Sequence, residues 1–305
     1  MISDRLVHAS IVDGIRLCKA MHDTYKHCDM LHLEQKLQEH QDKRIRVIIT
    51  DGVFSMDGDI APLDKIVALG EEYNALVFLD DSHASGFIGK TGRGVHEHFG
   101  VMGKIDILTT TLGKALGGAS GGCVSGRKEI VELCRQRARP YLFSNAVPPP
   151  IVASAIKVLE VLSASTERRD KLEANAKFWR QGLKDAGFVI KDGDSPIVPV
   201  MLFNAKLAQD VARDLYGEGI YVLGSSSRWS RRARRESAPN CRRTTTSRCW
   251  QVPWSRSRRS ARSTGFWAST RRASSRSLDS RRLRCLRQLR RPKGERRQAE
   301  GVGSN

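Results

Sequence analysis

TTTLGKALGGASGG, residues Thr109–Gly122, decides how the rest of the chain is interpreted, because it sets one lysine, Lys114, among five glycines. Glycine lacks the Cβ atom that blocks close approach, so a ligand can come near the backbone of such a passage. A phosphate or an aldehyde is the kind of ligand that an amine in this setting would meet. The other interpretation is a solvated lysine in an ordinary loop, and the surrounding sequence must decide between the two.

The sequence before this stretch alternates short apolar runs with helical patterns, and Asp29 is the expected N-cap of one helix. This alternation is typical of an α/β domain with a largely parallel sheet. Ligands in such domains bind at the carboxyl ends of the strands. The predicted elements are helices at 11–20, 30–40 and 62–73 and strands at 44–50, 75–79 and 105–111.

The sequence after this stretch predicts a second, smaller α+β domain. Its prolines favour an extended passage at 139–150. We therefore expect a partial large domain at 1–145, connecting helices with a partial small domain at 146–224, and an irregular tail at 225–305. The expected elements are helices at 129–138, 151–164, 167–186 and 205–217 and strands at 196–202 and 220–223.

The net charge of +19 belongs to the end of the chain. Residues 225–305 contain 23 Arg and one Lys against four acidic residues, whereas residues 1–224 hold 28 basic and 29 acidic residues. An Arg-rich segment with four Trp could bind nucleic acid. The near absence of Lys and the sudden loss of hydrophobic patterning favour an out-of-frame translation product instead, with a disordered segment as the next interpretation. We expect no nucleic-acid partner.

Several classes of protein are disfavoured by the composition. The sequence has no apolar run long enough to span a membrane and no signal-peptide pattern at its start, so a cytoplasmic location is expected. The seven Cys form no CxxC pair, which argues against a zinc ribbon and is typical of reduced thiols. No metal site is predicted.

Polar residues at the predicted strand ends could converge on Lys114. Asp80 and His83 follow one strand, Ser55 lies in the turn after another, and Thr111 comes three residues before the lysine. Each alone is more often structural, as a cap or a satisfied side chain. Together they suit an aldehyde cofactor that carries a phosphate and a pyridine nitrogen. A lysine amine condenses with the aldehyde, and a carboxylate keeps the pyridine nitrogen protonated.

Four motifs resemble the α-oxoamine synthases, a family of pyridoxal-phosphate (PLP) enzymes that condense an amino acid with an acyl-CoA. They are HASIVDG at 8–14, DGVFSMDGD at 51–59, LDDSHASGFIGKTGRG at 79–94 and TLGKALGGASGG at 111–122. The resemblance implies the aspartate-aminotransferase fold, known as PLP fold type I, with a mainly parallel sheet. Within the family, QRARPYLFSN at 136–145 is similar to the glycine C-acetyltransferase branch.

The resemblance also implies roles for single residues. Lys114 would be the Schiff-base lysine and the base, and Asp80 would face the pyridine nitrogen. His83 would contact the ring hydroxyl and His8 would stack on the ring. Three further residues would complete the PLP site: Ser55 near a ring substituent, Thr111 at the phosphate, and Ser144 with Asn145 at the phosphate of the other subunit of a homodimer.

The implied reaction joins glycine to acetyl-CoA, releasing CoA and 2-amino-3-oxobutyrate, and runs in reverse during threonine degradation. The alternative within the family is 8-amino-7-oxononanoate synthase, which shares the cofactor motifs and differs in its amino acid and acyl-CoA. Family members have a segment before the His8 motif and, past residue 223, an Arg-containing motif that binds the substrate carboxylate. Neither is found in this sequence, so we expect a truncated chain of low stability and impaired activity.

Overall fold

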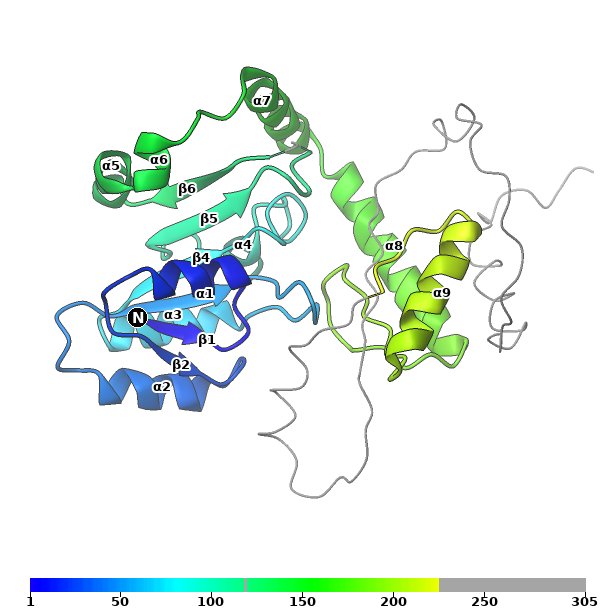
Figure 1. Ribbon diagram of the computed structural model, residues 1–305, viewed down its shortest axis with the longest axis horizontal. Helices are drawn as coiled ribbons and strands as arrows, with labels where there is room; N and C mark the ends of the chain where they lie inside the picture. The colour runs from blue at the N-terminus through cyan, green and yellow to red at the C-terminus, as the bar shows by residue number, and fades with distance from the viewer. Residues whose placement is uncertain (118–119, 225–305) are drawn as a thin grey trace, which may run out of the picture. The chain divides into compact units, whose positions relative to one another are not determined.

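The computed structural model describes residues 1–117 and 120–224 (Figure 1). The chain divides into two compact units, and the first consists of Met1–Ala176 with Lys191–Pro199. The described part of the second consists of 177–190 and 200–224. Residues 225–305, which the sequence predicts to be an irregular tail, lie outside the described residues.

The first unit is built on one six-stranded sheet with the order β2-β1-β3-β4-β5-β6 (Figure 1). Pairs from β2 through β5 are parallel, whereas β6 runs antiparallel to β5. The sheet is therefore largely parallel, as the alternating pattern predicts. Its strands are β1 (Ile2–Asp4), β2 (Asp23–Tyr25), β3 (Val47–Asp51), β4 (Leu76–Asp80), β5 (Ile107–Thr111) and β6 (Gly122–Gly126).

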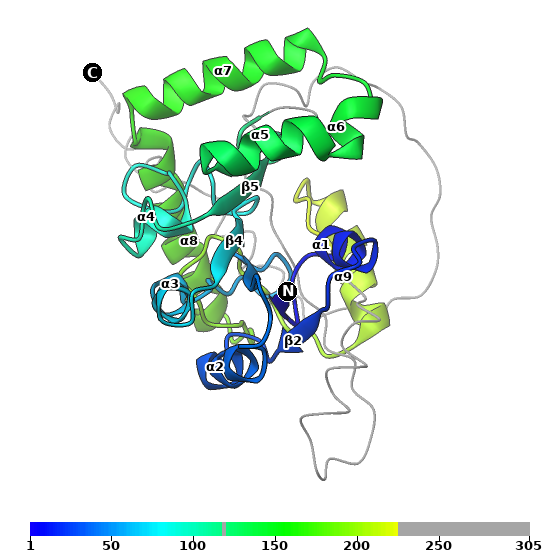
Figure 2. The ribbon, with the colours of Figure 1, turned by 90° about the vertical axis from the view of Figure 1, so that its left-hand side faces the viewer.

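Helices cover both faces of this sheet. Helices α2 (Met30–Glu39) and α3 (Leu63–Glu72) pack beside each other on one face, and α1 (Ala9–Arg16) lies on the other (Figure 2). This follows from the strand order, because the chain moves outward from β1 to β2 and then returns past β1 to β3. Right-handed crossovers in opposite directions place their helices on opposite faces.

The core lies between the sheet and the two helices α2 and α3. Leu33 and Leu37 of α2, Ile48 of β3, Leu63 of α3 and Leu79 of β4 are fully buried. Burial of such a side chain contributes roughly 2 kcal/mol. Helix α2 begins where the sequence predicts, because the Asp29 carboxylate accepts the amide of His32 at 3.0 Å. Helix α2 packs on β1 and β2 and helix α3 on β4, so together they hold the parallel strands in place with their carboxyl ends at one edge.

The helices after β6 differ from the sequence-based expectation at the prolines. The extended passage predicted at 139–150 is wrong in part, because α6 occupies Arg139–Phe143 and α7 already begins at Pro149. Proline is tolerated in the first helical turn, where its missing N–H has no intrahelical partner to lose. The remaining helices are α4 (Val95–His98), α5 (Lys128–Arg137), α7 (Pro149–Ala164), α8 (Glu167–Asp185) and α9 (Ala205–Gly217).

Two strands predicted near the end of the described chain are also wrong. The segment 196–202 makes only an isolated bridge, Ile190 to Val200, and 220–223 is not a strand. Helix α9 is confirmed with its predicted bounds, and the Asn204 side chain caps it by accepting the amide of Leu207 at 3.0 Å. No helix among the described residues combines the length and apolar character needed to cross a membrane.

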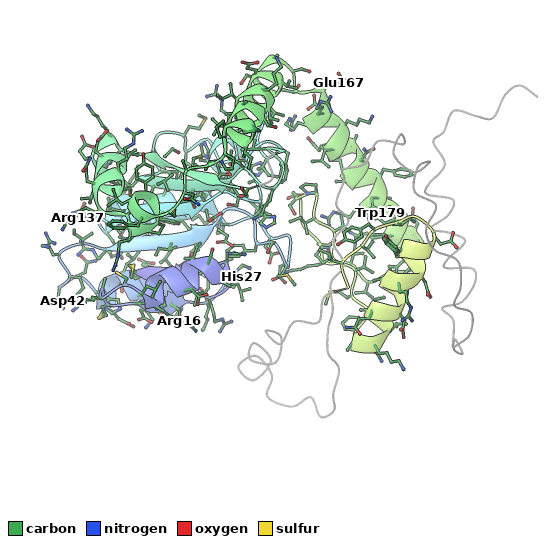
Figure 3. All side chains as sticks on the ribbon, turned by 45° about the horizontal axis from the view of Figure 1, so that its top comes forward. Arg16, His27, Asp42, Arg137, Glu167 and Trp179 are labelled. Atoms are coloured by element: carbon green, nitrogen blue, oxygen red, sulfur yellow. The ribbon has the colours of Figure 1, made fainter. Side chains whose placement is uncertain are left out.

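A chain of alternating charges joins distant segments of the first unit. His27, labelled in Figure 3, lies between Asp4 at 3.1 Å and Asp59 at 3.0 Å. Lys191 contacts Asp59 at 2.5 Å and Asp57 at 3.0 Å. Burial alone would lower the pKa of His27, but hydrogen bonds to the two carboxylates outweigh that effect and raise it to about 11. The ring is therefore charged at neutral pH and fixes the end of β1 to the turn after β3.

Candidate active site

A cavity of about 230 Å³ lies where the parallel strands end. This is the edge at which ligands bind in parallel α/β sheets. Five of the residues predicted from sequence to interact with the cofactor line it: His8, Asp80, His83, Thr111 and Lys114. The other lining residues are Ser10, Asp51, Val53 and Ser82.

The strand register puts two carboxylates of the cavity side by side, with a threonine next to them in the sheet. Asp51 of β3 is paired with Asp80 of β4, and Asp80 with Thr109 of β5. Neighbouring positions in a parallel register project to the same face of the sheet. The Asp80 carboxylate is held at both oxygens, since Oδ1 accepts the Ser82 amide at 2.9 Å and Oδ2 accepts the Thr109 hydroxyl at 3.0 Å.

Lys114 lies in the turn between β5 and β6, on the cavity. The amide of Leu112 donates to Gly121 O at 2.9 Å, which closes the base of this turn. Gly121 has φ +86°, a conformation that glycine adopts without steric cost. Burial lowers the pKa of the Lys114 amine, and the negative charges of Asp80 and Asp51 partly oppose that shift. A lowered pKa increases the fraction of neutral amine, which is the nucleophilic form.

Two imidazoles line the same cavity. Burial, together with the positive charge of Lys114, lowers the pKa of His83 to about 4, so this ring is neutral at physiological pH. His8 is the N-cap of α1, and its Nδ1 accepts the amide of Ser10 at 3.3 Å. The backbone amide of His8 donates to Asp51 Oδ1 at 3.3 Å. His8 is thus anchored to the sheet through its main chain.

Asp51 is a cavity residue that the sequence analysis did not single out. Its burial, followed by the negative charge of Asp80, raises the pKa of its carboxyl to about 7. A signal was present, because Asp51 ends β3 as Asp80 ends β4, and the two are neighbours in the sheet. Thr109 has no comparable signal in the sequence, because its bond to Asp80 depends on the register of β4 and β5.

The remaining predicted site residues lie elsewhere in this single chain. Ser55 is half-buried in the turn after β3, and Ser144 and Asn145 are exposed after α6. In the part of the chain that the structure describes, none of the three lines the cavity. The Thr111 hydroxyl donates to Gly121 O at 3.2 Å and accepts the amide of Gly113 at 3.1 Å. The cofactor roles of all these residues remain predictions.

Known proteins are similar to the part of the chain that contains this cavity. The model of the family "aminotransferase class I and II" matches residues 1–245. A 2-amino-3-ketobutyrate coenzyme A ligase from Escherichia coli K12 is 56% identical over 226 residues, which cover 73% of this chain and 57% of the relative. The mitochondrial enzyme of the same name from Homo sapiens is 53% identical, with 74% and 54% covered. The chain thus spans about half the length of these relatives.

Other proteins similar to this chain have names that denote different reactions. An 8-amino-7-oxononanoate synthase from Thermosipho melanesiensis is 47% identical over 222 residues, covering 73% of this chain and 56% of the relative. A solved serine palmitoyltransferase from S. paucimobilis, with PLP and myriocin bound, has a TM-score of 0.73 at 32% identity, covering 84% of this chain and 62% of that one. A serine palmitoyltransferase from Sphingomonas wittichii gives 0.75 at 26%, covering 94% and 64%.

Proposed function

Because the chain belongs to the aminotransferase class I and II family and has its aspartate-aminotransferase-like fold, we propose that the cavity at His8, Asp80, His83 and Lys114 binds PLP. We further propose that the whole protein is a glycine C-acetyltransferase, which joins glycine to acetyl-CoA. The identity of 56% to a 2-amino-3-ketobutyrate coenzyme A ligase supports this reaction over other reactions of the family. The single observation that carries the proposal is the meeting of Lys114 and Asp80 in one cavity.

The chemistry of the cavity fits this cofactor. PLP presents an aldehyde, a ring hydroxyl and a pyridine nitrogen, and the cavity offers an amine, a neutral imidazole and a carboxylate. The Lys114 amine suits the aldehyde because burial lowers its pKa. The Asp80 carboxylate, fixed at both oxygens, suits a protonated ring nitrogen. We propose that Thr111, which lines the cavity where the turn begins, receives the phosphate.

The bound cofactor would supply an electron sink for a carbanion formed at the Cα of glycine. We assign acceptance of the Cα proton to Lys114, because its lowered pKa leaves a larger neutral fraction than an exposed lysine has. Asp80 would maintain a positive charge on the ring nitrogen by its own negative charge. His83 would donate or accept a hydrogen bond without adding charge, since its ring is neutral.

We also propose that the protein is a homodimer in which Ser144 and Asn145 reach the site of the second copy. Both residues are exposed in the single chain, and α5 and α6 before them carry large exposed apolar side chains. Exposed apolar groups of this kind are typical of contact surfaces. These side chains are Leu133, Tyr141, Leu142 and Phe143.

The test is CoA release by the full chain supplied with PLP and acetyl-CoA, with glycine compared against alanine as the acceptor. Glycine-dependent release that disappears in Lys114→Ala supports the acetyltransferase reaction. A preference for alanine over glycine would overturn glycine as the amino-acid substrate. PLP binding without release for either amino acid would limit the proposal to the cofactor site of this chain.

A further inference from the structure

Among the described residues, the Asp80 carboxylate has two hydrogen-bond partners, one a backbone amide and the other a side chain. The Ser82 amide that reaches Oδ1 comes from the main chain two residues away and accompanies the turn itself. Thr109 reaches Oδ2 from the next strand, at 3.0 Å, and nothing in the local sequence of Asp80 requires it. The contact from the Thr109 hydroxyl therefore depends on which residue occupies that position of β5.

The strand register fixes this contact. Asp80 and Thr109 are Cα partners in neighbouring parallel strands, so both side chains leave the sheet on the same face. A Thr side chain in a strand has a restricted χ1, which limits the directions in which its hydroxyl can point. The hydroxyl thus holds Oδ2 from one side while the backbone amide holds Oδ1 from the other. Rotation of the carboxylate would break at least one of these bonds.

We infer that Thr109 is a positioning residue for Asp80, and that its hydroxyl fixes the carboxylate in the orientation in which it meets the cofactor ring nitrogen. This inference rests on the proposed PLP site. Thr109 itself touches no reacting atom in this account, and it acts only through Asp80. A hydrogen bond to a charged group is among the stronger ones in proteins, which makes its loss measurable.

The neighbouring residue supplies a matched control. Thr110 is also in β5, but its buried hydroxyl has no hydrogen-bond partner within the described part of the chain. Thr→Val is nearly isosteric and removes only the hydroxyl function. Thr109→Val therefore deletes a bond to Asp80, whereas Thr110→Val deletes no bond that the described structure shows. Thr109→Ser restores the hydroxyl and serves as the conservative rescue.

The experiment measures binding of PLP and of its 1-deaza analogue, in which carbon replaces the ring nitrogen, to the full-length chain and these three variants. Visible absorbance gives each dissociation constant. We expect Thr109→Val to weaken PLP binding about tenfold, as loss of a charge-assisted hydrogen bond does, and to leave binding of the deaza analogue unchanged. Thr109→Ser and Thr110→Val should bind PLP as the unsubstituted chain does.

The outcomes separate this inference from the proposed function. If the unsubstituted chain does not bind PLP, the proposed cofactor site is wrong and the inference fails with it. If the chain binds PLP and Thr109→Val binds it equally well, only the role of Thr109 is overturned. Equal weakening for PLP and the deaza analogue would also overturn it, because a general structural defect does not depend on the ring nitrogen.

Discussion

Asp51 is a buried carboxyl group whose nearest strand neighbour is another carboxylate, Asp80. Ionisation of Asp51 is opposed first by burial and then by the charge of Asp80, and these effects raise its pKa to about 7. The unfolded chain would ionise the same group near pH 4. The folded state therefore binds more protons between these values, and the free energy of unfolding falls as the pH rises from about 4 through about 7.

Replacement of Asp51 by Asn should stabilise the protein at alkaline pH. The amide oxygen can still accept the His8 amide, while the buried charge is removed. We expect the free energy of unfolding at pH 8 to increase by something on the order of 2 kcal/mol, with little change at pH 4.5. Urea unfolding at both pH values measures this. Asp13→Asn is the control, because Asp13 is exposed in an ion pair with Arg16. Equal stabilisation at both pH values would contradict the account.

Much of the site was accessible from sequence at the residue scale. Asp80, His83, Thr111 and Ser55 were predicted to converge on Lys114, and the structure brings all of them except Ser55 to one cavity. His8, which the resemblance alone placed at the cofactor ring, lines the same cavity. Asp51 and Thr109 were missed because their importance depends on register. A lone polar residue at a strand end is ordinary, and only its pairing with Asp80 gives it a defined neighbour.

At the scale of elements, the turn between β3 and α3 is held by a later segment of the chain. Gly58 has φ +74°, and its carbonyl accepts the buried Ser195 hydroxyl at 2.6 Å. A Cβ on Gly58 would lie 2.9 Å from Ile197 O, which is backbone and cannot move as freely as the end of a side chain. This turn follows directly from Asp51, so its packing also supports the cavity.

Gly58→Ala should therefore lower the free energy of unfolding by more than a glycine substitution that introduces only the same backbone strain. Gly100 is the matched control, because its φ is +69° and a Cβ there would meet nothing within 4 Å. We expect Gly100→Ala to lose about 1 kcal/mol from the left-handed conformation. Gly58→Ala should lose roughly 1–3 kcal/mol more from overpacking. Similar losses in chemical denaturation would show that residues 191–199 do not restrain the turn.

Elements with strong local signals were predicted well. Helices α2, α3 and α9 and the central strands followed from apolar periodicity and caps. Strands β1, β2 and β6 were not predicted, because none of them has the pattern of an independent strand. In β6, Gly122 permits the close pairing with β5, since a Cβ there would lie 2.6 Å from Thr110 O. Such a strand is defined by its partner, which the local sequence does not reveal.

At the scale of the whole molecule, His27 connects segments that lie far apart in the sequence. Its raised pKa, about 11, means that its contribution to stability is complete below its unfolded pKa near 6.5 and is lost as the pH rises toward 11. Removing the ring leaves the buried Asp4 carboxylate without its charged partner. The sequence did not indicate this network, because its members are separated by up to 187 residues, from Asp4 to Lys191.

His27→Gln should lower the free energy of unfolding by about 3 kcal/mol at pH 6, as removal of one partner from a buried ion pair does. The difference from the unsubstituted protein should shrink at pH 10, because above about pH 6.5 the unfolded chain no longer holds the proton that the folded state still binds at His27. Urea unfolding at pH 6, 8 and 10 measures this. His98→Gln, at an exposed histidine, should change little at any of these pH values. A His27→Gln defect that is constant with pH would argue for packing instead of charge.

Covalent trapping of PLP on the full-length chain directly tests whether Lys114 is the lysine that binds the cofactor aldehyde. The chain is incubated with PLP, reduced with borohydride, digested and analysed by mass spectrometry. We expect a pyridoxyl group on the peptide that contains Lys114, and its loss in Lys114→Ala. A pyridoxyl group on another lysine with Lys114 unmodified, or unchanged labelling in Lys114→Ala, would contradict it.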